Sequence, residues 1–184
     1  MTAGPFLLER LGALLHQSVR DTAARHRLLP IHVQVLQYLG LANQYSDLPI
    51  AVAEYFGITR GTVSQSLAVL ERRGLVARQA DARHGRRIHF QLTEAGAAIV
   101  REGWARRLDE TLRTLPGAAT IEEALRDVLV ALQRLNGQRA FGICHQCAHF
   151  RREAGGARCG LTGEPLAPEQ TTKICREWAE PEAA

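Results

Sequence analysis

The sequence predicts a mainly α-helical protein with one small β-hairpin, followed by a short metal-binding tail that carries four cysteines. Apolar residues follow a helical spacing through most of residues 1–137, and the spacing changes to two residues near residues 75–93. All four cysteines lie after residue 143. The 184 residues, 46% of them hydrophobic, are enough for one ordinary domain with an appendage. We therefore expect a first domain over residues 1–137 and an extension over residues 138–184.

Four helices are expected before the hairpin. The first spans about residues 5–26, and Pro30 opens the second in its first turn. The stretch "SDLPIAVAEYFGI" predicts a short third helix, capped by Ser46 or Asp47 and ended at Gly57. The fourth, "TRGTVSQSLAVLERRG", has one apolar stripe. That stripe consists of Val63, Leu67 and Leu70.

Two short strands and two more helices complete the first domain. "LVARQ" and "RIHFQLT" alternate as strands do, and the polar "DARHGR" between them predicts a hairpin loop. One helix should then run from Glu94 to Pro116. Another should start near Thr120, with Glu123 in a capping box, and end at Gly137.

Positive charge gathers around the hairpin. Residues 60–89 hold seven arginines against Glu71 and Asp81, whereas the whole chain has a net charge of only +4. A basic block on a nearly neutral body indicates a surface that binds a polyanion.

Two short helices joined at Gly57 and followed by this hairpin predict a winged helix-turn-helix, with a reading head over about residues 31–95. The apolar stripe should hold the fourth helix on the body and leave its polar residues facing a DNA groove. The hairpin arginines should reach phosphates or the minor groove. The expected DNA-binding residues are Arg60, Thr62, Ser64, Gln65, Arg83, Arg86 and Arg87.

Over about residues 5–137 the chain resembles the MarR family of bacterial transcriptional regulators. The resemblance lies in the order of helices, in "LERRGLVAR" and in "DARHGRRIHFQLTEAG". It implies a MarR-like homodimer, held by residues 5–27 and 94–136, whose two recognition helices read a palindromic operator in double-stranded DNA. Apolar faces on the last two helices also favour a dimer over a monomer, because monomers rarely leave such patches exposed. The resemblance further allows a small-molecule effector.

Two positions depart from the family pattern. His84 and Gly85 stand at the wing tip where many members have Asp-Arg, so we expect Asp81 and Arg83 to form the ion pair that orients the wing. Ser64 and Gln65 stand where many members have Ser-Arg or Thr-Arg, so the operator preference of relatives does not transfer to this chain.

The four cysteines form a candidate metal site in the extension: Cys144, Cys147, Cys159 and Cys175. The sequence has no apolar run long enough to cross a membrane and no secretory signal, so the protein is expected to be cytoplasmic. In the cytoplasm four cysteines at this spacing indicate a metal site more than two disulfides. Metal binding would also supply folding energy to a polar segment that has little to bury.

The sequence leaves two kinds of metal centre possible, a structural zinc ion and an iron–sulfur cluster. One Cys-x2-Cys turn suits structural zinc, but zinc ribbons usually repeat that turn. Iron–sulfur clusters accept ligands from separate loops, so one pair and two single cysteines suit them better. The tail also resembles high-potential iron–sulfur proteins in "CHQCAHF", "CGLTGEPL" and "CREW". That resemblance implies a 4Fe–4S cluster walled by Phe150, Leu161 and Trp178.

The expected function is transcription regulation, with a repressor whose operator binding is modulated by a redox-sensing 4Fe–4S cluster. One alternative keeps the regulator but has a structural or sensing zinc site and a small-molecule effector pocket. Another is a cluster-bearing redox protein that uses the winged helix to dock on other proteins. A hydrolytic enzyme is not expected, because the sequence has no phosphate-binding loop, no nucleophile paired with a base, and no carboxylate constellation.

Overall fold

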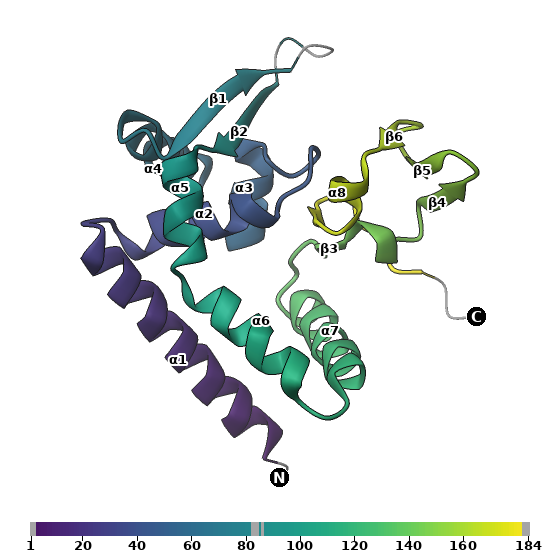
Figure 1. The fold of residues 1–184 in the computed structure, drawn as a ribbon, viewed down its shortest axis with the longest axis horizontal. Helices are drawn as coiled ribbons and strands as arrows, with labels where there is room; N and C mark the ends of the chain where they lie inside the picture. The colour runs from purple at the N-terminus through teal and green to yellow at the C-terminus, as the bar shows by residue number, and fades with distance from the viewer. Residues whose placement is uncertain (1–2, 82–84, 86, 182–184) are drawn as a thin grey trace.

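The computed structural model describes residues 3–81, 85 and 87–181. A winged helix-turn-helix lies above the first helix and the two helices that precede the tail, and the tail folds beside it (Figure 1). Its first 137 residues form α1 (Gly4–Arg25), α2 (Pro30–Leu41), α3 (Pro49–Phe56), α4 (Arg60–Arg72), β1 (Val76–Ala80), β2 (Ile88–Leu92), α5 (Glu94–Arg101), α6 (Trp104–Thr114) and α7 (Ala118–Leu135). This order confirms the predicted fold class for the first domain.

The reading head is built around one apolar core. Helices α2, α3 and α4 bury their aliphatic residues against one another, with Leu36, Val52 and Leu67 among the most buried. The wing strands pair antiparallel, with Val76 opposite Leu92 and Ala80 opposite Ile88. The core thus fixes the helix pair and the base of the wing as one unit.

The predicted cap of α3 is wrong. Leu48 occupies the cap position without a side-chain hydrogen bond, and Pro49 supplies the first turn. Ser46 and Asp47 are buried and bind groups outside the helix. Gly57 does end α3, in the left-handed conformation at φ 62°.

The two helices after the wing also differ from the prediction. The single helix expected from Glu94 is broken at Gly103, whose backbone is extended, and Trp104 then packs against the core of the reading head. The last helix begins at Ala118 after Gly117, whose left-handed φ of 74° replaces a side-chain cap. The capping box of Glu123 does not form, because the turn at Gly117 starts the helix earlier.

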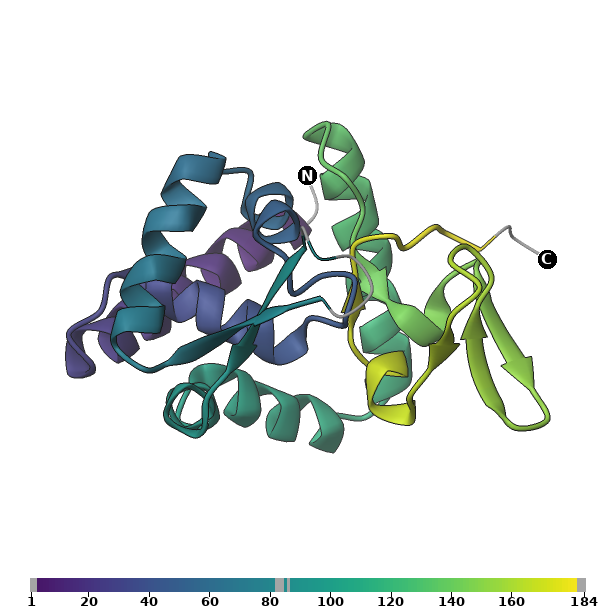
Figure 2. The same cartoon turned by 90° about the horizontal axis from the view of Figure 1, so that it is seen from above.

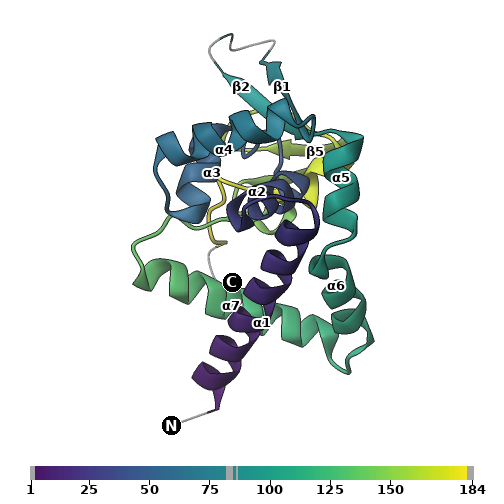
Figure 3. The same cartoon turned by 90° about the vertical axis from the view of Figure 1, so that its left-hand side faces the viewer.

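Helices α1, α6 and α7 extend below the reading head (Figure 3). Each presents few buried residues, and α6 has none. The large apolar side chains exposed on α1 and α7 are Phe6, Leu7, Leu8, Leu11, Leu14, Leu125, Leu129, Leu132 and Leu135. None of the described helices is long and apolar enough to cross a membrane.

The tail (residues 138–184) folds into very short elements: β3 (Gly142–Ile143), the 3-10 turn η1 (Cys144–Gln146), β4 (Phe150–Glu153), β5 (Gly156–Cys159), β6 (Pro165–Leu166), α8 (Pro168–Thr171) and β7 (Ile174–Cys175). Strands β4, β5 and β6 form one small sheet, and β3 pairs with β7. Its own core contains Cys144, Cys159, Leu166, Cys175 and Trp178, packed against Val130 of α7. Cysteine side chains therefore occupy the centre of the tail.

The tail also packs directly on the reading head (Figure 2). Phe141 is buried in the core of the head, with its ring centroid 5.2 Å from that of Tyr55. Strand β7 forms a parallel bridge between Ile174 and Ala42, at the end of α2. The tail is therefore connected to the rest of the protein by packing on the reading head as well as by the chain that follows α7.

Candidate nucleic-acid interface and cysteine centre

The first turns of α4 present a polar surface, as predicted. Thr59 caps the helix, since its Oγ1 accepts a hydrogen bond of 3.1 Å from the backbone N of Thr62. The stripe of Val63, Leu67 and Leu70 is buried, which fixes the orientation of the helix. The predicted contact residues are all exposed: Arg60, Thr62, Ser64 and Gln65.

The wing supplies one described arginine to the same surface. Arg60, Ser64 and Arg87 line one hollow of about 840 Å³, which Thr162 of the tail also borders. Thr62 and Gln65 are exposed but do not line it. The other two predicted contacts, Arg83 and Arg86, lie outside the described residues.

The base of the wing is held by a histidine between two carboxylates. His89 Nδ1 lies 2.5 Å from Asp47 Oδ1, and His89 Nε2 lies 3.4 Å from Asp81 Oδ2. Burial disfavours the charged imidazole, but the two carboxylates outweigh it and raise the pKa of His89. The predicted ion pair between Asp81 and Arg83 involves a residue outside the described part of the chain, so it stays a prediction; Asp81 also lies against His89.

The four cysteines come together in the tail as free thiols. Cys144, Cys159 and Cys175 are buried, and Cys147 is partly buried against the same cluster. Burial and the three neighbouring thiols raise the pKa of Cys144 to about 12. Cys144 and Cys175 are 31 positions apart in the sequence, yet their thiols lie close enough to interact. A metal site that uses all four cysteines requires this proximity.

Backbone and side-chain donors point toward the sulfur atoms. The backbone N of His149 and of Ala179 donate to Cys147 Sγ over 3.4 and 3.3 Å. Burial raises the pKa of Cys175, and the side chain of Asn43 partly offsets that rise. The buried Nδ2 of Asn43 has no hydrogen-bond partner among the described residues. Donors of this kind stabilise thiolates that bind a metal.

The wall of the cysteine cluster is only partly as expected. Trp178 is buried and donates from Nε1 to Gln146 O at 3.0 Å, and Phe150 packs against the cluster. Leu161 is 52% exposed, so its predicted place in the wall is wrong. Leu161 lies in the turn after β5, and Leu166 on the paired strand β6 is buried instead.

The donor set fits a metal centre in chemistry, although it is not a compact single-ion site. In the part of the chain that the structure describes, no three Cys, His, Asp or Glu side chains are grouped so that they could hold one metal ion. The four thiols are nevertheless close enough to influence one another electrostatically.

A separate cavity of about 400 Å³ lies between α1, α2 and α6. Two donors on its lining residues, Gln37 Nε2 and Trp104 Nε1, are buried and have no hydrogen-bond partner among the described residues. Unpaired buried donors are costly, so this cavity is suited to a ligand that brings an acceptor.

Residues 28–87 match the MarR family. This segment spans α2, α3, α4, β1 and the described start of the wing loop. The match therefore covers most of the predicted reading head, but not β2, the helices α1, α6 and α7, or the tail. Comparison with curated protein sequences gives no match.

Solved structures with the same fold include the following three. S. aureus MepR in its DNA-binding conformation is 23% identical, with a TM-score of 0.59 over 73% of this chain and 99% of MepR. CouR from Rhodococcus jostii, bound to p-coumaroyl-CoA, is 24% identical, with a TM-score of 0.52 over 71% of this chain and 90% of CouR. Apo MarR from E. coli is 19% identical, with a TM-score of 0.50 over 70% and 98%. At these identities the likeness shows that the chain has the MarR-like winged-helix fold.

Proposed function

We propose that this protein is a DNA-binding transcriptional regulator, acting as a repressor on a palindromic operator. The observation that carries the proposal is the start of α4, where exposed Arg60, Ser64 and Gln65 stand on a buried apolar stripe. Arg87 of the wing shares a hollow with two of them. A helix fixed in this way can present hydrogen-bonding side chains to base edges while the wing contacts phosphate.

Operator binding can be tested without knowing the regulated genes. A site selected from a random duplex pool should bind in gel shifts, and its affinity should fall steeply as salt rises. Arg60→Gln should weaken binding, by about 1–3 kcal/mol if the guanidinium contacts a base. Arg107→Gln makes the same charge change on the exposed surface of α6 and should have little effect. If no sequence is selected, the proposal fails, and a redox protein with a docking module becomes the better interpretation.

The active form is a homodimer that pairs through α1, α6 and α7. Support comes from the leucines exposed on α1 and α7, which form apolar surface that a monomer rarely leaves bare. Leu129, on α7, is 49% exposed. Leu129→Glu should shift sedimentation toward a monomer, and a protein that remains a dimer would place the interface elsewhere.

The four-cysteine centre modulates this binding as a 4Fe–4S cluster. One tetrahedral zinc ion needs four sulfur atoms about 2.3 Å from a single point. A cluster distributes its thiolates over several irons and so suits thiols that surround a larger space. Here one close pair and two single cysteines come from separate segments of the tail, which favours the cluster over zinc. When bound, a cluster supplies an oxidation-sensitive group at the junction of the tail and the head.

The metal is identified by anaerobic purification. Broad visible absorbance with iron and acid-labile sulfide supports the cluster, whereas a colourless protein with stoichiometric zinc contradicts it. Cys144→Ser or Cys175→Ser should abolish loading and change operator affinity. Unchanged affinity in both variants under every redox condition would make the centre purely structural.

A second candidate signal is a small molecule in the cavity between α1, α2 and α6. The buried donors of Gln37 and Trp104 favour a ligand with a carbonyl or carboxylate oxygen. CouR has been crystallised with such a compound, an acyl-CoA ester. Ligand titration of fully metal-loaded protein separates this signal from the cysteine centre, since only an effector changes operator affinity at constant loading.

A further inference from the structure

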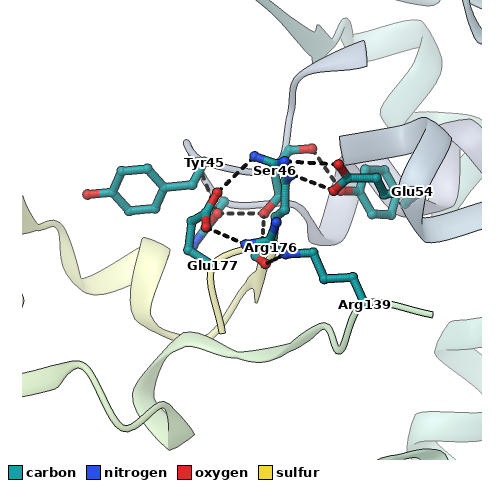
Figure 4. Close-up of polar contacts among 8 residues, drawn as sticks. Tyr45, Ser46, Glu54, Arg139, Arg176 and Glu177 are labelled. Carbon is teal, nitrogen blue, oxygen red and sulfur yellow. Dashed lines mark hydrogen bonds and ion pairs between the residues drawn. The ribbon is translucent and has the colours of Figure 1, made fainter. Parts of the chain in front are cut away.

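Arg176, directly after Cys175, joins the tail to the helix-turn-helix (Figure 4). Its Nε and Nη2 lie 2.6 and 2.9 Å from the two carboxylate oxygens of Glu54 on α3. The two side chains are only 20% and 29% exposed. A two-pronged, partly buried pair fixes direction as well as distance, so it holds the tail against one face of α3.

The backbone beside Arg176 is fixed as firmly. Arg176 N donates to Ser46 Oγ at 2.8 Å, and Ser46 Oγ donates to Asn43 Oδ1 at 2.9 Å. Asn43 N donates in turn to Ile174 O at 3.0 Å. Ser46 and Asn43 are almost completely buried, at 0% and 1% exposure. The strand that carries Cys175 is therefore seated on the loop between α2 and α3.

A second arginine holds Arg176 in place from the tail side. Arg139 Nε donates to Arg176 O at 2.9 Å, and Arg139 Nη2 lies 2.6 Å from Glu177 Oε2. Glu177 Oε1 also accepts from Arg176 Nη1 at 2.8 Å. Figure 4 shows these groups converging between the tail and α3. The orientation of Arg176 is thus set by neighbours on both sides of Cys175.

The same loop also contacts the wing. Asp47, next to Ser46, accepts a hydrogen bond of 2.8 Å from Phe90 N through its carbonyl, and its carboxylate contacts His89. On one side the loop therefore carries the tail, and on the other it carries β2. These contacts connect β7 directly to α3, which leads through Gly57 into α4, and to the base of the wing.

We propose that Arg176 is a positioning residue that couples the state of the cysteine centre to the orientation of α3 and the wing within one subunit. The proposal rests on the regulatory function proposed above and names its route. While Cys175 is held by the centre, β7 stays seated and Arg176 holds Glu54. When the centre is lost, the two-residue strand β7 loses its anchor, and the head populates other orientations.

The test compares centre-loaded protein, purified anaerobically, with the same protein after chelation under reducing conditions. In the wild type, operator affinity should differ between the two forms by at least about 5-fold, within the usual range of allosteric coupling. In Arg176→Gln the two forms should bind alike, although both still bind the operator. Arg158→Gln is the matched control, because Arg158 also lies in the tail, where its side chain hydrogen-bonds to Glu153 and Gly163 of the same small sheet and turn. The control should keep the wild-type difference.

A second readout does not depend on DNA. Hydrogen exchange of the amides in α3 should rise on removal of the centre in the wild type and in Arg158→Gln. In Arg176→Gln it should already be high and should not rise further. Glu54→Gln should reproduce this behaviour, and the double variant should add nothing to either single change.

The outcomes separate the two proposals. If Arg176→Gln keeps the full wild-type difference in affinity and in exchange, the coupling through Arg176 is wrong. If loading changes neither quantity in the wild type, the coupling is also wrong. If no operator is found but exchange in α3 follows loading and depends on Arg176, then the DNA-binding function fails while the coupling is supported.

Discussion

Replacing Ser46 by alanine tests how firmly the tail is seated on the reading head. Ser46 is fully buried, and its hydroxyl bridges Arg176 N and Asn43 Oδ1. Ser46→Ala removes both hydrogen bonds and leaves the Arg176 N–H without its acceptor. Asn43 Oδ1 keeps its hydrogen bond of 3.0 Å from the backbone N of Tyr45, so only one group is newly unpaired.

The expected cost follows from these contacts. One lost hydrogen bond and one unpaired N–H together destabilise the fold by about 1.5–3 kcal/mol. For a chain of this size, that corresponds to a fall in Tm of about 4–10 °C. Urea and thermal unfolding measure the change, with Ser18→Ala as the control. Ser18 on α1 has only a local, exposed hydrogen bond to Leu14 O, so its replacement should be close to neutral. A loss below about 0.5 kcal/mol for Ser46→Ala, the range of ordinary surface substitutions, would refute the seating of the tail on this loop.

Three further variants test the cap of α4, the seat of Trp178 and the base of the wing. Thr59→Ala should destabilise α4 by about 1 kcal/mol and weaken operator binding, measured by urea unfolding and gel shift; unchanged values for both would contradict the capping role. A Cβ added at Gly142 would lie 2.5 Å from the Trp178 indole, so Gly142→Ala should expose that ring and red-shift its fluorescence; an unchanged spectrum would refute the contact. Because the pKa of His89 is raised, its ion pair with Asp47 contributes fully below the unfolded pKa of about 6.5 and is lost as the pH rises above it. Wild-type stability minus that of His89→Gln should therefore fall from pH 6 to pH 8, and a constant difference would rule out the ion pair.

The reading head was predictable because its signals are local. Pro30 at a first helical turn, Gly57 at a left-handed helix end and alternating residues in two strands each specify conformation within a few residues. The wrong details depend on distant contacts. The break at Gly103 allows Trp104 to pack on a core built from α2, α3 and α4. The spacing of apolar residues within the helix does not predict this break.

The gathering of the four cysteines was predictable from the sequence, but the position of the tail on the reading head was not. The four cysteines indicated a shared site, and the structure brings their side chains into one cluster. Leu161 and Leu166 are equally apolar in sequence, and only the pairing of β5 with β6 decides that Leu166 is buried. The contact between Arg176 and Glu54 joins residues 122 positions apart. An arginine between a cysteine and a glutamate carries no local sign of such a partner.

The proposed signal from the cysteine centre could reach DNA by two physical routes, and the contacts favour the route through the reading head. The tail also meets α7, which belongs to the proposed dimer interface, through Val130 and an ion pair between Arg134 and Glu180. The side chains of that pair are 67% and 49% exposed, and exposed pairs of this kind contribute little. Arg176 and Glu54 are much less exposed and are joined to a buried hydrogen-bond chain through Ser46. A displacement of β7 should therefore move α3 and the wing of the same subunit before it changes the distance between the two reading heads of the proposed dimer. A monomeric Leu129→Glu variant separates the two routes, because loading should still change exchange in α3 there, while any effect that requires two linked heads disappears.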